Sequence, residues 1–245
     1  MNEEVTRSPS LRRLPVGATY NLRDIGEYPA RGGAQTLPGR LFRSDAARFT
    51  DGPDLAGLGL RTVVDLRDDR EAELRPTGLD ALVPAVLRRP LDPHSLLSEI
   101  SEDSPDPLGE LYLAFTRERG AKLAEIVTDL ARPGALPALV HCAAGKDRTG
   151  VVIALVLSAI GVPDDVVAAD YAITSTNLAQ AFFDGLPAES VGADPGDEVL
   201  RGARPESMTT LLHALTAEYG TTHGYLVAHG VPDEAIDHLR TALTH

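Results

Sequence analysis

Apolar and polar positions alternate in blocks along the chain, and the pattern predicts an α/β protein. Short apolar runs that contain β-branched residues are typical of buried strands. Residues 62–66 form such a run, and further strand-like segments lie at residues 21–25, 40–44, 85–91 and 136–141. Polar stretches with helical character separate several of them, as in a sheet whose strands alternate with helices. We therefore expect a central, mostly parallel sheet of four or five strands flanked by helices.

The helices are predicted from apolar residues that recur every three or four positions. Residues 108–132 carry such a stripe, which we expect to be interrupted near Gly120. A further helix is expected to begin near Arg148. Another is expected at Pro163, because proline is favoured in the first turn of a helix. Acidic residues at 68–71 favour another helix start, and two or three helices close the chain.

The pattern shows no internal repeat and no clear domain boundary. We expect residues 1–245 to form a single domain that begins with a polar N-terminal segment. Stretches rich in Gly, Pro, Ser and acidic residues are typical of loops, and they predict flexible connections near 94–107 and 185–205.

Charge and cysteine content narrow the possible functions. A net charge of −13 and a pI near 4.9 argue against general binding to nucleic acid or anionic membranes. The single cysteine permits no internal disulfide, which fits a reducing compartment. The first residues lack the apolar stretch of a signal peptide, and the longest apolar run, residues 151–162, is too short to span a bilayer. We predict a cytoplasmic protein without stable membrane insertion, which leaves open an export route that needs no signal peptide.

The segment around Cys142 joins a predicted buried strand to a predicted apolar helix through a short loop, His141-Cys142-Ala143-Ala144-Gly145-Lys146-Asp147-Arg148-Thr149-Gly150. A loop that leads into a helix N-terminus is a ready anion site, because its N–H groups converge and the helix dipole adds positive charge. Gly145 lets the backbone curl closely around a tetrahedral anion. The residues 143–148 are therefore the predicted phosphate-binding loop.

Two side chains of this loop carry the expected chemistry. The amide field at Cys142 favours a nucleophilic thiolate at neutral pH. Arg148 lies in the first turn of the helix, where its planar fork can bind two phosphoryl oxygens. We expect Thr149 to donate a hydrogen bond to the cysteine sulfur, and His141 to orient the loop through hydrogen bonds. No metal-ligand spacing occurs, and the chemistry requires no metal or organic cofactor.

The pattern H-C-x5-R-[ST]-G resembles the motif of the protein tyrosine phosphatase superfamily. By average residue usage, the pattern C-x2-G-x2-R-[ST]-G that the loop also fits arises at a given position with a chance on the order of one in a million. The loop is most similar to the HCxxGKDRTG loop of a bacterial branch whose loop is like that of phosphoinositide phosphatases. Weaker likenesses extend over nearly the whole chain, at residues 21–24, 39–44, 64–67 and 219–231. The resemblance implies a single-domain cysteine-phosphatase fold and a phosphorylated protein or phosphoinositide as substrate: phosphotyrosine, with phosphoserine, phosphothreonine or phosphoinositides for some members.

The general acid has two candidates. Many tyrosine phosphatases carry their acid in a Trp-Pro-Asp loop, and this chain has no tryptophan. Asp92 follows a predicted strand and could reach the leaving oxygen from a loop. Asp147 lies inside the phosphate loop, where a neighbouring phosphate dianion helps a carboxylic acid to keep its proton. Each also has a structural interpretation, Asp92 as a turn former and Asp147 as a brace of the loop.

Three basic residues are candidates for the rim of the site. Only two of the 23 basic residues are lysines, and one of these, Lys146, lies in the phosphate loop. We expect Lys146 to contact a second anionic feature of the substrate. Arg67 and Arg70 add positive charge if they face the pocket, but pairing with Asp65, Asp68 or Glu71 is the favoured interpretation.

Two other functions compete with phosphate-monoester hydrolysis. A rhodanese-type sulfurtransferase also uses a cysteine in an anion-cradling loop, but the Arg148-Thr149-Gly150 ending disfavours it. A catalytically silent phosphate-binding module is disfavoured because Cys142, Arg148 and two candidate acids are all present.

Overall fold

The computed structural model describes residues 13–14, 16, 18–46, 53–92, 94–97, 100–101, 104–178 and 202–245. Within them, five strands form one sheet: β1 Arg23–Asp24, β2 Leu41–Ser44, β3 Thr62–Asp65, β4 Ala85–Arg88 and β5 Ala138–His141. The strand order is β1-β2-β5-β3-β4, and only the β1–β2 pair is antiparallel. The mostly parallel α/β sheet predicted from the sequence is confirmed, with each strand shorter than its apolar run.

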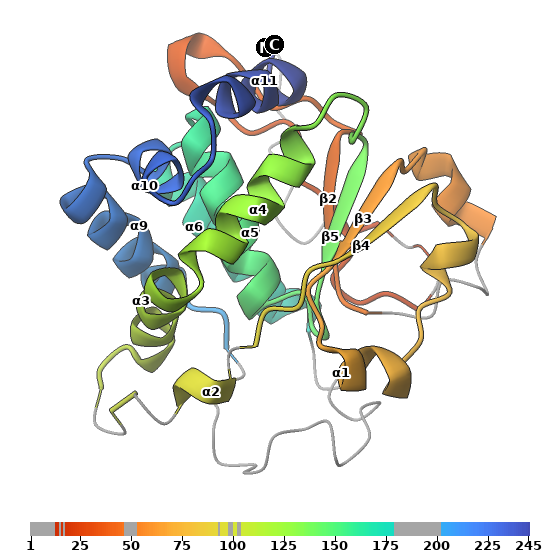
Figure 1. The fold of residues 1–245 in the computed structure, drawn as a ribbon, viewed down its shortest axis with the longest axis horizontal. Helices are drawn as coiled ribbons and strands as arrows, with labels where there is room; N and C mark the ends of the chain where they lie inside the picture. The colour runs from red at the N-terminus through yellow and green to blue at the C-terminus, as the bar shows by residue number, and fades with distance from the viewer. Residues whose placement is uncertain are drawn as a thin grey trace, which may run out of the picture.

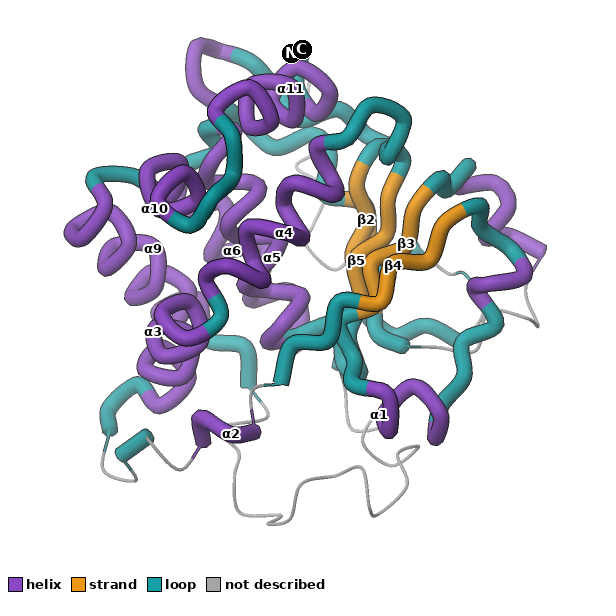
Figure 2. The backbone as a smooth tube through the Cα atoms, in the orientation of Figure 1, coloured by secondary structure: helices purple, strands orange, loops and turns teal. Residues whose placement is uncertain are grey.

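The sheet is covered on both faces, which explains why every residue of its inner strands β2, β3 and β5 is buried and why adjacent residues in them are apolar. On one face Leu41, Val64 and Val140 join a large hydrophobic cluster with the helices. On the other face Phe42, Val63 and Leu139 form a smaller cluster with the short 3-10 helices η3 Pro53–Leu58 and η4 Leu79–Ala81 and their flanks. Figures 1 and 2 show the helices gathered on one side of the strands and these short turns on the other.

The helices follow the predicted order. They are α1 Asp69–Leu74, α2 His94–Leu97, α3 Pro107–Glu118, α4 Gly120–Ala131, α5 Asp147–Ile160, α6 Asp164–Asn177, α9 Pro205–Tyr219, α10 Thr222–Ala228 and α11 Asp233–Leu243. The long stripe is interrupted before Gly120, as predicted. A Cβ on Gly120 would lie 2.1 Å from the ring of His229, so glycine lets α10 pack closely against this junction.

Helix α5 is the central helix of the fold and lies between the sheet and the other helices (Figure 1). Residues 151–157 are all at most 1% exposed, which explains their apolar character on every side of the helix. Its N-terminus meets the carboxyl ends of the parallel strands. The helix dipole and the strand ends therefore converge on one edge of the sheet, where α/β proteins bind ligands.

One predicted loop contains regular structure. The short helix α2 lies within the segment 94–107, because Leu96 is buried in the main cluster and ties that part of the loop down. Residues 98–99 and 102–103 of this segment, and 185–201 of the second predicted loop, lie outside the described residues. The single domain over residues 1–245 stays a prediction. Among the described helices, none is long and apolar enough to cross a membrane.

Candidate active site

Cys142 follows strand β5 directly, and α5 begins five residues later at Asp147. The loop between them is the predicted phosphate loop, and Cys142 is buried in it with 3% of its surface exposed. It is the sole cysteine of the chain. Ala143 and Ala144 are partly exposed, so the loop opens to solvent beyond the cysteine.

Gly145 makes the tight curvature of the loop possible. Its φ is +66°, in the left-handed region that favours glycine. A Cβ at this position would lie 2.3 Å from the carbonyl oxygen of Ser44, at the end of β2. The neighbouring strand therefore supports the loop backbone directly, and any larger residue at 145 would push the two apart.

Arg148 is fixed by a bidentate pair with Glu71 of α1. Its Nη1 and Nη2 donate to the two carboxylate oxygens at 2.6 Å each. Nη1 also reaches the carbonyl oxygens of Leu66 and Leu91, at 3.3 and 3.4 Å. The guanidinium is thereby held in one orientation across the ends of the strands, and only 7% of the residue is exposed.

The arrangement leaves one edge of the Arg148 guanidinium for a ligand. Arginine has five N–H donors, and Glu71 and the two carbonyls engage three of them. The edge formed by Nε–H and the second Nη2–H makes no hydrogen bond within the described part of the chain. That edge has the bidentate geometry that matches two oxygens of a phosphoryl group.

The electrostatics of Arg148 favour a permanent positive charge. Burial by itself lowers the pKa of the guanidinium, but the bond to Glu71 and the charge of the Cys142 sulfur outweigh it. The pKa therefore lies above its ordinary value.

His141, which precedes the cysteine, and Thr149, in the first turn of α5, are both fully buried. Burial lowers the pKa of His141 to about 4, so the imidazole is neutral at pH 7. Its Nδ1 lies 3.4 Å from the carbonyl oxygen of Cys142, and its Nε2 lies 3.8 Å from Asp65. The Thr149 hydroxyl makes no hydrogen bond within the described residues, and its bond to the cysteine sulfur stays a prediction.

Asp147 is held by a buried tyrosine pair. The hydroxyl of Tyr112 in α3 donates to Asp147 Oδ1 at 2.5 Å and lies 2.5 Å from the hydroxyl of Tyr171 in α6. Burial raises the pKa of both tyrosines, followed by the charge of Asp147, so both remain neutral donors. About a third of the Asp147 side chain, 32%, is still exposed, which keeps it open toward a ligand.

Lys146 is more buried than a loop lysine usually is. Its side chain is 6% exposed, its Nζ donates to the carbonyl oxygen of Gly202 at 3.1 Å, and it lies 3.5 Å from Asp147 Oδ1. The ammonium therefore lies at the junction between the phosphate loop and the segment before α9.

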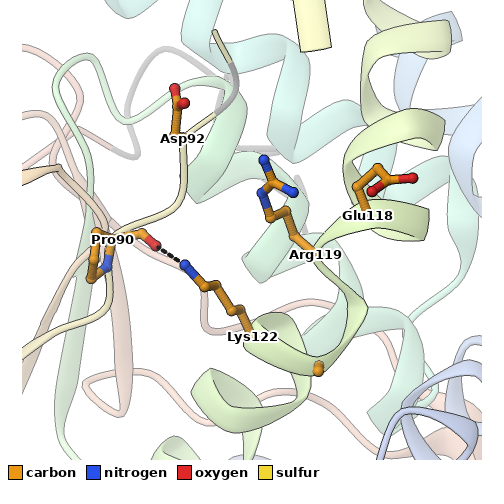
Figure 3. A pocket seen from close by; sticks show the side chains of 6 residues that line it. Pro90, Asp92, Glu118, Arg119 and Lys122 are labelled. Atoms are coloured by element: carbon orange, nitrogen blue, oxygen red, sulfur yellow. Dashed lines mark hydrogen bonds between the residues drawn. The ribbon is translucent and has the colours of Figure 1, made fainter. Parts of the chain in front are cut away.

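Asp92 lies beside the site and not in the loop. The carbonyl of its neighbour Leu91 accepts from Arg148, while the exposed Asp92 side chain lines a surface pocket of about 270 Å³. Figure 3 shows Arg119 and Lys122 reaching into this pocket from the helical side, with Lys122 bonded to the carbonyl of Pro90. Cys142 and Arg148 do not line this pocket. We therefore assign the candidate active site from the residues of the phosphate loop and not from the position of the pocket.

The favoured interpretation of Arg67 is correct. It is 2% exposed and makes a bidentate pair with Asp65, at 2.9 and 2.7 Å, instead of facing the pocket. Arg70 is exposed on α1. Within the described residues no three His, Cys, Asp or Glu side chains gather as a metal site requires.

The sequence did not reveal the role of Glu71. Asp68 and Glu71 form a capping box, in which each side chain bonds the backbone N–H of the other. That pattern predicts the start of α1 but gives no sign that the same Glu71 carboxylate binds Arg148. The contact joins residues 77 positions apart, which local sequence patterns do not report.

Comparisons with known proteins agree with this geometry. A family model described as tyrosine phosphatase family matches residues 14–245. The chain is 32% identical to the triple specificity protein phosphatase PtpB of Mycobacterium tuberculosis, over 96% of this chain and 99% of that protein. It is 30% identical to a tyrosine-protein phosphatase of Nostoc commune, over 86% and 76%, and 28% identical to a putative tyrosine-protein phosphatase of Cupriavidus necator, over 87% and 82%.

Proposed function

The chain belongs to the tyrosine phosphatase family, and we propose that it hydrolyses phosphate monoesters by way of a cysteinyl-phosphate on Cys142. The observation that carries the proposal is the position of both groups on one strand–loop–helix segment. Buried Cys142 directly follows β5, and Arg148 lies in the first turn of α5 with one guanidinium edge that makes no hydrogen bond within the described residues. A sulfurtransferase accounts less well for an arginine held with one bidentate edge unused, and a silent binding module gives no role to the buried Cys142 at the end of β5.

The reaction has two steps. The thiolate of Cys142 attacks phosphorus, an S–P bond forms, and the P–O bond to the leaving group breaks as that oxygen takes a proton from an aspartic acid. Water then attacks phosphorus, its proton passes to the aspartate, and the S–P bond breaks to regenerate the thiolate. Arg148 and the loop amides stabilise the equatorial oxygens in both transition states.

The substrate class is supported by the relatives and by the loop. One relative is named a triple specificity phosphatase, which supports a range beyond phosphotyrosine. Phosphate release from phosphotyrosine, phosphoserine and phosphothreonine peptides and from phosphoinositides, without added metal, tests the proposal. We expect phosphotyrosine to be turned over, and release from none of them would contradict the proposed function. The cytoplasmic location remains a prediction; a reducing compartment would suit an enzyme with a thiolate nucleophile.

The general acid is either Asp92 or Asp147, and leaving-group dependence distinguishes them. Loss of a general acid costs about 10²- to 10⁴-fold for a leaving group that needs a proton. We expect the Asp→Asn variant of the true acid to lose this much with phenyl phosphate and far less with 4-nitrophenyl phosphate. Its pH–rate profile also loses the limb at high pH, where the acid must stay protonated. The other variant keeps the wild-type dependence, and if both variants do so, neither residue is the acid.

Lys146 is proposed to favour substrates with a second anionic group. We expect Lys146→Ala to lower the ratio of phosphoinositide to phosphotyrosine-peptide turnover about tenfold, in the range of a charged hydrogen bond. Lys122→Ala is the matched control, because it removes the chain's other lysine at a position outside the loop. An unchanged ratio in both Lys146→Ala and Lys146→Arg would contradict this role.

A further inference from the structure

The carbonyl groups of the phosphate loop are held from behind by two buried side chains. Asn21 Nδ2 donates to the carbonyl oxygens of Ala144 and Gly145, at 3.1 and 3.0 Å. Arg43 Nη2 donates to the same Gly145 oxygen at 2.8 Å. Both residues are 0% exposed, and neither is part of the loop motif. A third carbonyl, that of Ala143, accepts from the backbone N–H of residue 46 at 3.0 Å.

These bonds fix the direction of three consecutive peptide planes. In a planar trans peptide the C=O and N–H groups point in opposite directions. Because the carbonyls of residues 143–145 point toward Asn21, Arg43 and the end of β2, the N–H groups of residues 144–146 point to the other side. Those of Ala144 and Gly145 make no hydrogen bond within the described residues. A row of such donors forms a concave anion site.

A buried carboxylate connects the two holding side chains. Asp170 of α6 accepts from Arg43 Nη1 at 2.6 Å and from Arg23 Nε at 3.0 Å. Arg23 in turn bonds the Oδ1 of Asn21 at 2.5 Å. We call Asn21, Arg23, Arg43 and Asp170 the loop bracket. It ties the loop to β1, β2 and α6, and all four residues are at most 1% exposed.

Burying the charged groups of the loop bracket costs free energy, and the ion pairs among them offset that cost. Burial alone raises the pKa of Asp170, but the two arginines outweigh it and hold the pKa well below its ordinary value. Burial lowers the pKa of Arg23 to about 10, which still leaves it charged at neutral pH. Breaking one partner of such a group leaves the other charges buried without compensation. The network therefore resists distortion and can hold the loop in one conformation.

We propose that Arg43, held by Asp170, is a positioning residue of the phosphatase reaction, which fixes the loop amides toward the phosphoryl oxygens before the substrate binds. The inference rests on the proposed function of Cys142 and extends it to residues more than 20 positions from the loop in both directions of the chain. Arg43 is fully buried and makes no hydrogen bond to Cys142 within the described residues, so it acts through the carbonyl of Gly145. The position needs two separate N–H donors on one side chain, and not only a positive charge, because Nη1 bonds Asp170 while Nη2 bonds the loop.

The test compares Arg43→Lys, Arg43→Met and Asn21→Ala. Arg43→Lys keeps the charge but not the two-sided fork, and Asn21→Ala removes the other two loop bonds without removing a charge. Tungstate inhibition measures anion binding. The pH midpoint of iodoacetamide alkylation measures the ionisation of the sole cysteine, because the thiolate is the form that reacts. We expect each variant to weaken tungstate binding about 10- to 100-fold and to move the alkylation midpoint to higher pH.

Asp129→Asn is the matched control. Asp129 is a buried carboxylate that also binds two arginines, Arg89 at 2.8 Å and Arg132 at 3.0 Å, and among the described residues it makes no hydrogen bond or ion pair with the phosphate loop. We expect a lower Tm with unchanged tungstate inhibition and alkylation. Wild-type behaviour of Arg43→Lys and Asn21→Ala, or an equal loss in Asp129→Asn, would overturn the proposal. Alkylation and direct tungstate binding by calorimetry need no turnover, so they remain informative even if no substrate is hydrolysed.

Discussion

Cys142→Ser is expected to lower turnover of an aryl phosphate by on the order of 10⁴-fold or more, the largest effect of any single substitution in this chain. An alcohol is not ionised at neutral pH, so the serine oxygen cannot replace the thiolate as nucleophile. The substitution is nearly isosteric at a position that is 3% exposed, and the fold should tolerate it. Phosphate release with phosphotyrosine peptide and 4-nitrophenyl phosphate measures the effect.

Two controls separate lost chemistry from lost structure. The variant should retain tungstate binding and a Tm close to wild type, because the amides and Arg148 that we propose to bind the anion are unchanged. In the wild type, alkylation of one thiol per chain should abolish activity, since the chain has a single cysteine, and tungstate should protect it. Residual turnover within tenfold of wild type would show that Cys142 is not the nucleophile.

The sheet could be predicted from the sequence because its signals are local. Strands β2, β3 and β5 are buried at every position, and the adjacent apolar pairs Leu41-Phe42, Val63-Val64 and Leu139-Val140 are signals that the sequence shows. The break between α3 and α4 was visible for a similar reason, as Gly120 interrupts the apolar stripe. The strand order was not predictable, because pairing joins β5 with β2 and β3 across long stretches of sequence.

The residues of the candidate site also differ in whether a local sequence pattern predicts them. Cys142, Gly145 and Arg148 belong to one short segment whose strand–loop–helix context is visible in the sequence. Glu71 contacts Arg148 across 77 positions, and Asp170 is connected to the segment through Arg43, which lies 127 positions from it. Buried charges of this kind need partners, but the sequence shows only that partners must exist and not which ones they are. The prediction of Arg67 succeeded because its partner Asp65 is two residues away.

Arg148→Lys is expected to lower kcat/KM about 10²- to 10³-fold, the range for loss of a preorganised donor to a transition-state oxyanion. Two edges of the guanidinium can bind acidic groups. The Nη1–Nη2 edge bonds Glu71, and the Nε–Nη2 edge is the proposed site of the phosphoryl group. A lysine keeps the charge but is a single point donor, so it cannot bond the carboxylate and hold two phosphoryl oxygens at once. The loss should appear mainly in kcat, because the fork matches the planar equatorial oxygens of the transition state better than the ground state.

Glu71→Gln separates the contribution of the Arg148 guanidinium from the contribution of the carboxylate that orients it. It retains an acceptor for one Arg148 N–H but loses the second bond and the negative charge, so the guanidinium keeps its free edge with less restraint. We expect a smaller loss, about tenfold, together with a modest rise in the tungstate inhibition constant. If Glu71→Gln costs as much as Arg148→Lys, the carboxylate acts in the reaction itself. If Arg148→Lys retains kcat within a few-fold, the free edge of Arg148 is not where the phosphoryl group binds, and the loop amides alone stabilise the transition state.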